Sequence, residues 1–263
     1  MPFTPAHAVV ALPFVRTPLM PAAIAIGAMT PDLPLFTRGI GVSYGFTHTA
    51  ANVVWTTLIA FVLLLAWRVV LRPALTALAP DALAARLPDS WRRTGREAAL
   101  EVVAPRERFG HPLLVVVALM LGVLSHIVWD IFTHEGRWGV DTFPALQDQW
   151  GPLLGYKWLQ HGSSVIGLLI LGVYALLWLR RREPVTRPRL LLAWMRWVWY
   201  ATLPVLLAAG WLIGLAAHGP ITETFTLQHL AYRALPPAVG VWGAMTLLLC
   251  AVIVPAAERR RAA

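Results

Sequence analysis

Residues 113–134 read LLVVVALMLGVLSHIVWDIFTH, an apolar run of membrane length whose last third holds three ionisable side chains. About 20 helical residues cross a hydrocarbon core of about 30 Å. His126, Asp130 and His134 are spaced four residues apart, which places them on one helical face. Ionisable groups in such a run are costly and usually face a partner, a cavity, an ion or a substrate. The run therefore predicts a transmembrane helix with a polar site near its C-terminal end.

The side chains on this face favour a metal site. Imidazole and carboxylate groups are the ligands that zinc and related divalent metals prefer. The alternative interpretation is that His126, Asp130 and His134 are satisfied polar groups at the end of a helix.

The composition is that of an integral membrane protein. Of the 263 residues, 58% are hydrophobic and only 13% are charged, whereas soluble chains have about 25% charged residues. We expect an all-α, polytopic helical bundle in which residues 1–263 form a single membrane domain. The five predicted spans are residues 52–70, 112–132, 164–179, 198–217 and 238–257.

The N-terminal region is apolar but interrupted. Within residues 5–29, prolines occur at positions 13, 18 and 21, together with Arg16. Proline inside a helix removes a hydrogen bond and clashes with the preceding turn. We therefore expect two short helices, arranged as a broken hairpin within residues 1–50. Such backbone is tolerated at membrane depth only where protein or a wet cavity covers it.

The basic residues predict how the spans are oriented, because arginine and lysine accumulate in cytoplasmic connections. Arginines are frequent in residues 73–111 and 180–196 and at the C-terminus, whereas the connections at 133–163 and 218–237 hold three basic residues between them. We expect the arginine-rich segments and the C-terminus in the cytoplasm, and 133–163 as an external loop. The net charge of +9 then reflects topology and contact with anionic lipids. No nucleic-acid partner is expected, since the arginines lack a recognisable binding module.

This topology brings most of the histidines to one membrane face. The second span runs outward, so His126 and His134 lie at its external end, as do His48 before the first span and His161 at the third. Histidines scattered through a core would show no such bias.

Three further candidate ligands precede the first span. His7 opens the first short helix, Asp32 lies in the turn TPDLP, and His48 lies in the segment FTHT. Each has a simpler interpretation as a cap or turn residue. Together with His126, Asp130 and His134 they supply six ligands, which suits two nearby ions with Asp130 or Asp32 as a bridge. The expected cofactor is zinc, as one or two ions, with manganese as the alternative.

A second polar group begins the third span. These side chains either orient the ligands, contact substrate, or serve only as helix caps and solvated interfacial groups. They are Tyr156, Gln160, His161, Ser163 and Ser164.

The same residues carry a family resemblance. The opening MPFTPAH, the Pro31-Asp32 turn, FTHT at 46–49, S-H-x3-D-x2-T-H at 125–134 and Y-x3-Q-x2-S-S-x2-G at 156–167 resemble an uncharacterised bacterial membrane family, domain of unknown function 4184. The resemblance covers most of the chain and is densest over residues 1–170. That family is similar in turn to inner-membrane proteins described as metal-dependent hydrolases and, more distantly, to zinc-dependent phospholipase C.

The resemblance implies metal ligands at His7, Asp32, His48, His126 and Asp130. The broader group often lacks a histidine at the position of His134. The expected function is hydrolysis of a phosphoester in a lipid or lipid-linked substrate, at the outer face of the bacterial cytoplasmic membrane. Membrane lipids are the expected partners.

Two other functions stay open. A non-catalytic structural or assembly protein would hold its metal in a closed coordination sphere, or hold none. A transporter would place polar residues at mid-depth in several spans, yet residues 164–179 and 238–257 contain almost none.

Overall fold

The computed structural model describes residues 3–103, 110–186 and 189–262 and is 78% helical. Within these residues the one sheet is a hairpin of β1 (Gln149–Trp150) and β2 (Leu153–Leu154). In the described parts of the chain, five helical stretches are long and apolar enough to cross a membrane, which confirms the expected all-α class and makes the chain a multi-pass membrane protein. They are Ala50–Leu78, His111–Thr133, Gly155–Arg180, Ala193–His218 and Leu227–Arg259.

Several spans are longer than predicted. The third begins at Gly155, where 164 was expected, because the polar residues that lower its hydropathy continue the helix and find partners inside the protein. The fifth begins at Leu227, where 238 was expected, and its helix continues through Pro236 and Pro237. The first continues to Leu78 through a π-helical segment.

The connections are correspondingly shorter and more structured than predicted. The arginine-rich segment at 73–111, expected as a cytoplasmic loop, holds several short helices. The segment expected as a loop at 133–163 holds a helical turn and the hairpin before α10 begins. Arg106, Arg108 and Arg187, which contributed to the topology prediction, lie outside the described residues.

The chain forms two compact units, each built from three separate segments. The first unit comprises Met1–Leu33, Val42–Ala66 and Leu100–Arg182, and the second comprises Pro34–Gly41, Trp67–Ala99 and Glu183–Ala263. Neither unit is therefore a continuous stretch of sequence.

The first unit contains the two short N-terminal helices that the prolines predict. The 3-10 helix η1 (Thr4–Phe14) and the helix α1 (Pro21–Met29) each have a proline in their first turn, which suits a helix start. The unit's other elements are η2 (Thr30–Asp32), α3 (Tyr44–Thr47), η3 (Ala50–Asn52), α4 (Val53–Ala66), α8 (His111–Thr133), α9 (Trp138–Thr142), η6 (Pro144–Leu146) and α10 (Gly155–Arg180).

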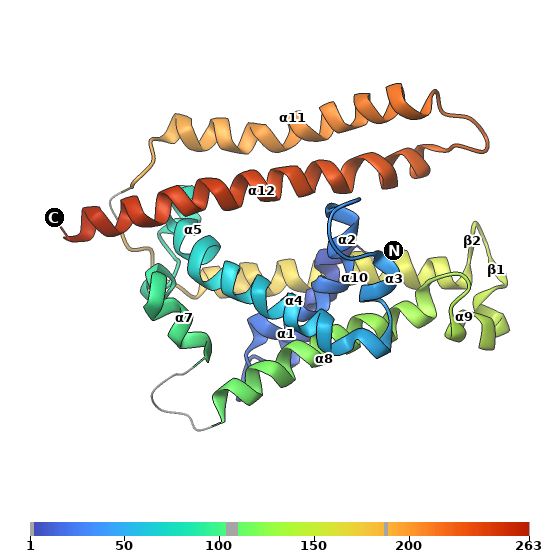
Figure 1. Ribbon diagram of the computed structural model, residues 1–263, viewed down its shortest axis with the longest axis horizontal. Coiled ribbons are helices and arrows are strands. Elements are labelled where there is room, and N and C mark those ends of the chain that lie inside the picture. Colours follow the sequence, from blue (N-terminus) through green and yellow to red (C-terminus); the bar gives the residue numbers. More distant parts are fainter. Residues whose placement is uncertain (1–2, 104–109, 187–188, 263) are drawn as a thin grey trace. The chain divides into compact units, whose positions relative to one another are not determined.

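Helices α1 and α8 lie against each other through glycine (Figure 1). A Cβ atom on Gly122 would lie 2.2 Å from the carbonyl oxygen of Ile24, and one on Gly27 would lie 2.3 Å from that of Leu119. Both distances are far below van der Waals contact, so only glycine permits this approach. Small residues allow the same close backbone packing between membrane helices in general.

The second unit contains α2 (Leu33–Phe36) apart from its first residue, η4 (Trp67–Leu71), α5 (Arg72–Leu78), α6 (Asp81–Ala84), η5 (Asp89–Arg92) and the start of α7 (Gly95–Val103). Its two long helices, α11 (Ala193–His218) and α12 (Leu227–Ala262), run side by side in Figure 1.

Polar contacts in the second unit involve arginines of the basic connections. Arg196 donates two hydrogen bonds to Asp81, with distances of 2.6 and 3.2 Å. Arg189 donates to the carbonyl oxygens of Thr76 and Ala79 at the C-terminal end of α5. Basic side chains commonly bond the last carbonyl groups of a helix in this way. These arginines therefore stabilise the fold of this unit.

Candidate metal centre

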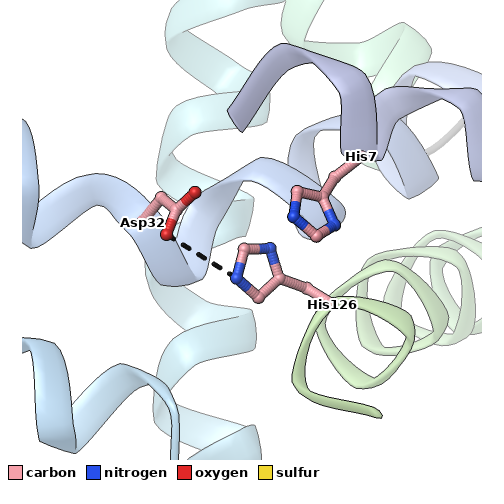
Figure 2. A group of neighbouring side chains, drawn as sticks. All are labelled: His7, Asp32 and His126. Atoms are coloured by element: carbon pink, nitrogen blue, oxygen red, sulfur yellow. Dashed lines mark ion pairs between the residues drawn. The ribbon is translucent and has the colours of Figure 1, made fainter. Parts of the chain in front are cut away.

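The candidate ligands come from four places in the first unit. His7 lies in η1, Asp32 ends η2 directly after α1, His48 follows α3, and His126 and Asp130 are one turn apart near the C-terminal end of α8. All five are buried. Figure 2 shows three of them, His7, Asp32 and His126, pointing toward one another from three separate segments. The predicted convergence of these distant residues is thus present in the structure.

Four atoms form the centre of this cluster, and we call them the four-atom core: His48 Nε2, His126 Nε2, Asp32 Oδ1 and Asp130 Oδ2. The two nitrogens lie 3.2 Å apart. Asp130 Oδ2 is 3.5 Å from each of them. Asp32 Oδ1 is 3.6 Å from the His48 nitrogen and 3.7 Å from the His126 nitrogen.

Backbone carbonyls fix the orientation of both imidazoles. His126 Nδ1 lies 2.7 Å from the carbonyl oxygen of Ala28, and His48 Nδ1 lies 2.9 Å from that of Tyr44. A carbonyl oxygen only accepts, so each Nδ1 donates, and the Nε2 of a neutral ring then presents its lone pair. Two lone pairs and two carboxylate oxygens face one another, an arrangement that calls for a positive charge between them.

The electrostatics of His48 follow from this arrangement. Burial alone lowers the pKa of His48, but the contacts with Asp130 and Asp32 outweigh burial and raise it above the ordinary value. The pocket therefore favours a cationic species beside the two carboxylates.

His7 lies next to the core with an unused nitrogen. Its ring stacks on His126 with the ring centres 4.0 Å apart. Among the described residues, its buried Nε2 has no hydrogen-bond partner. Burial, with a smaller effect of the nearby His126, lowers the pKa of His7 to about 4, so the ring is neutral at pH 7. A ligand atom of His7 lies within 4.8 Å of ligand atoms of Asp32 and His126.

Each carboxylate is held by one neighbour and keeps one oxygen unused. Thr4 Oγ1 donates to Asp32 Oδ2 at 2.6 Å, and the Tyr44 hydroxyl donates to Asp130 Oδ2 at 3.4 Å. In the described part of the chain, Asp32 Oδ1 and Asp130 Oδ1 are buried without a hydrogen bond. Buried unsatisfied oxygens are rare. A cation in the four-atom core would satisfy Asp32 Oδ1, whereas Asp130 Oδ1 lies 3.5 Å from His134 Nδ1.

His134 lies beside the four-atom core. Its Nδ1 is 3.5 Å from Asp130 Oδ1 and 3.1 Å from the Thr133 hydroxyl, and the side chain is partly exposed. Burial lowers the pKa of His134 to about 4. His126, Asp130 and His134 therefore do share one face, but His134 contacts only the Asp130 oxygen that lies outside the four-atom core.

The polar residues at the start of α10 divide into several groups. Gln160 is buried, and its Nε2 lies 3.5 Å from His134 Nε2. Ser164 Oγ accepts a hydrogen bond of 2.8 Å from the backbone N–H of Phe3, which fastens the start of η1 to α10. Tyr156 donates to Glu135 and Ser163 accepts from the Trp129 indole, and neither pair includes a candidate ligand. His161 is exposed.

Two residues that sequence reasoning did not place at the site hold the ligands in position. Thr4, the first residue of η1, donates its hydroxyl to Asp32. Tyr44 stacks on His48 with ring centres 3.6 Å apart and also reaches Asp130. The signals were the position of Thr4 in the opening motif and the helical spacing of four between Tyr44 and His48.

The comparisons with known proteins give a family. The model of the family "Domain of unknown function (DUF4184)" matches residues 1–255. The chain belongs to this family. The match confirms the predicted resemblance and covers every candidate ligand of this DUF4184 protein. No curated protein and no solved structure matches the chain, so the family brings no activity with it.

Proposed function

We propose that this DUF4184 protein binds one divalent cation, zinc or in its place manganese, in the four-atom core, and that it hydrolyses phosphoester bonds. The observation that carries the proposal is the convergence of two imidazole nitrogens and two carboxylate oxygens from segments far apart in the chain.

The distances support a tetrahedral site. Zinc binds nitrogen and oxygen at about 2.0–2.1 Å, so ligand atoms around a tetrahedral ion lie about 3.3–3.4 Å apart. Five of the distances among the four core atoms range from 3.2 to 3.7 Å. A small ion would thus fit with shifts of a few tenths of an ångström.

The same geometry favours one ion over two. Among the described residues, the ligand atoms of His7, Asp32 and His126 are close enough to hold an ion, and so are those of His48, His126 and Asp130; both triads include His126. Because His126 Nδ1 faces the carbonyl of Ala28, only its Nε2 is left for a metal. One imidazole nitrogen binds one ion.

A catalytic assignment follows if three residues bind the ion and the fourth position is left to water, as in catalytic zinc sites. His48, His126 and Asp130 are the proposed ligands. The ion would lower the pKa of water and neutralise charge on the phosphoryl oxygens. Asp32, held by Thr4 through its other oxygen, would accept a proton from water as the water oxygen bonds to phosphorus. The phosphorus–oxygen bond to the leaving alcohol breaks, and the proton passes to that alcohol.

A structural role is the second candidate, and the near-equal core distances favour it. If Asp32 Oδ1 is a fourth protein ligand, the site is closed, and the ion only fastens η2, the end of α3 and α8 together. His7, with its unused nitrogen beside the core, takes part in neither assignment.

The location is part of the proposal. From the distribution of arginines, we infer that the site faces the exterior of a bacterial cytoplasmic membrane and that the C-terminus is cytoplasmic. A phosphoester in a lipid or lipid-linked molecule is the substrate that such a position suits.

Metal analysis tests the site. Protein purified in detergent without chelator should contain about one equivalent of zinc or manganese, as expected for a single coordination sphere. His126→Ala and Asp130→Ala should lose it, whereas His161→Ala, which removes an exposed histidine of α10, should keep it. Metal-free wild-type protein would overturn the proposal.

Asp32→Asn separates the two roles. For a catalytic Asp32, the variant keeps its metal but loses hydrolysis of bis(p-nitrophenyl) phosphate, a generic phosphodiester probe. For a structural site, Asp32→Asn loses metal, and wild-type protein does not cleave the probe.

A further inference from the structure

A cleft of about 620 Å³ lies between η1, α8 and α10 in the first unit. Most of its lining is apolar, including Val9 and Val10 of η1 and Ile166 and Ile170 of α10. The polar side chains in the lining are His7, Ser125 and Ser163. Because His7 also stacks on His126, one wall of the cleft is shared with the metal centre.

Two tryptophans in the cleft wall are fixed by hydrogen bonds. The indole of Trp129 donates to Ser163 Oγ at 3.2 Å, and the indole of Trp158 donates to the carbonyl oxygen of Trp150 at 2.6 Å. Tryptophan with one apolar and one polar edge is typical of the membrane–water boundary. These side chains mark the polar end of the cleft.

Glycines keep the cleft open along α10. A Cβ atom on Gly162 would meet nothing within 4 Å, so space is free above this residue. A Cβ atom on Gly167 would lie 3.1 Å from the carbonyl oxygen of Ala6, so the floor is formed by close contact between η1 and α10.

The dimensions fit one leaflet of a membrane. Lining residues on α10 extend from Trp158 to Ile170, which is about 18 Å at 1.5 Å per residue. Half of a hydrocarbon core of about 30 Å is about 15 Å. Ile166 and Ile170 are 58% and 46% exposed, so the cleft opens toward the side of a membrane-spanning helix, where lipid chains surround the protein.

We propose that this cleft binds one acyl chain of a membrane phospholipid, which enters sideways from the bilayer. The apolar lining accepts the chain, and His7, which belongs to the same lining and stacks on His126, brings the lipid's phosphate group toward the four-atom core. The placement of the phosphate rests on the proposed function, whereas the chain site rests on the cleft alone. The substrate class is then a phospholipid.

Filling the cleft tests the proposal. Gly162→Leu places a side chain in the free space, and Ile166→Trp narrows the cleft from a second position. Gly172→Leu is the matched control, because Gly172 is on the same helix, has open space above it and lies outside the cleft lining. Each variant is placed in lipid nanodiscs with a phospholipid that carries a photoreactive diazirine in its acyl chain.

Cross-linked residues are then identified by mass spectrometry. Wild type and Gly172→Leu should concentrate the label on cleft residues, and both cleft variants should reduce it by about tenfold, as expected when added side chains overfill a cavity. Equal labelling in all four proteins would overturn the proposal. So would displacement of the label by a polyisoprenoid phosphate but not by excess phospholipid.

Metal content and cleavage of bis(p-nitrophenyl) phosphate are measured on the same samples. Gly172→Leu should keep both, since Gly172 lies outside the cleft lining and has open space above it. Metal-free wild type that still labels in the cleft would overturn the proposed function but support the lipid site. Active, metal-bound wild type without cleft labelling would overturn the lipid site alone.

Discussion

The contact between α1 and α8 makes the metal centre sensitive to a single methyl group at Gly122. In Gly122→Ala, the new Cβ would lie 2.2 Å from the carbonyl oxygen of Ile24 and 2.7 Å from the backbone nitrogen of Ala28. Relieving the first contact requires the two helices to separate by about 1 Å, since non-bonded atoms need about 3.3–3.5 Å.

That separation would reach the ligands directly. The Ala28 carbonyl is 2.7 Å from His126 Nδ1, and a movement of about 1 Å exceeds the range of a hydrogen bond. Asp32 lies just beyond the end of α1 and would move with it. We expect a loss of unfolding free energy of about 1–3 kcal/mol, typical of overpacking. We also expect a 10- to 100-fold weaker metal affinity, typical of losing a group that orients a ligand.

Thermal unfolding in detergent and competition with a chromophoric zinc chelator measure the two effects. Gly172→Ala is the control, because its Cβ meets nothing within 4 Å and alanine favours a helix. If Gly122→Ala matches this control in melting temperature and zinc affinity, the argument from helix separation is wrong.

Three further outcomes are expected. Thr4→Val removes the hydrogen bond to Asp32 with little change in volume, so zinc affinity measured by chelator competition should fall by about 10- to 100-fold, while Thr222→Val, in the second unit, should leave it unchanged. The hydrogen bond from Arg196 lowers the pKa of Asp81, so this pair stabilises the fold above the unfolded carboxyl pKa of about 3.9, and the stabilisation is lost as the pH falls through the lower folded value. Asp81→Asn should therefore melt at a lower temperature than wild type at pH 7, and a difference that persists unchanged at pH 3 would contradict the pairing. A reporter fused after Arg182 should be cytoplasmic and one inserted near Asp141 external, and the reverse pattern would move the site to the cytoplasmic face.

The positions of the helices followed from hydropathy, but their ends did not. The predicted third span began at residue 164, too late in the chain, because residues 155–163 include the polar side chains of Tyr156, Gln160 and His161. In the structure Gln160 is buried next to His134, so its polarity is satisfied inside the protein. Local hydropathy does not contain that information, because the partner lies elsewhere in the chain.

In the candidate site, too, local features could be predicted from the sequence and supporting contacts between distant segments could not. The spacing of His126 and Asp130 on one face was readable, because helical periodicity is a local property. The convergence of His7, Asp32 and His48 was expected from topology and family resemblance together. The supporting contact from the Ala28 carbonyl was not predictable, since it depends on how closely α1 approaches α8 through two glycines.

The hydrogen bond between Phe3 and Ser164 joins residues 161 positions apart, and it has a consequence for how the protein is made. The segment that bears His7 leaves the ribosome first, yet Ser164 is synthesised about 8–32 s later at 5–20 residues per second. During that interval, His7 and Asp32 have already been synthesised, but α10 is not yet present to hold η1. Under the proposed function, the contact with Ser164 therefore fastens η1 and His7 beside a four-atom core whose residues were all made earlier.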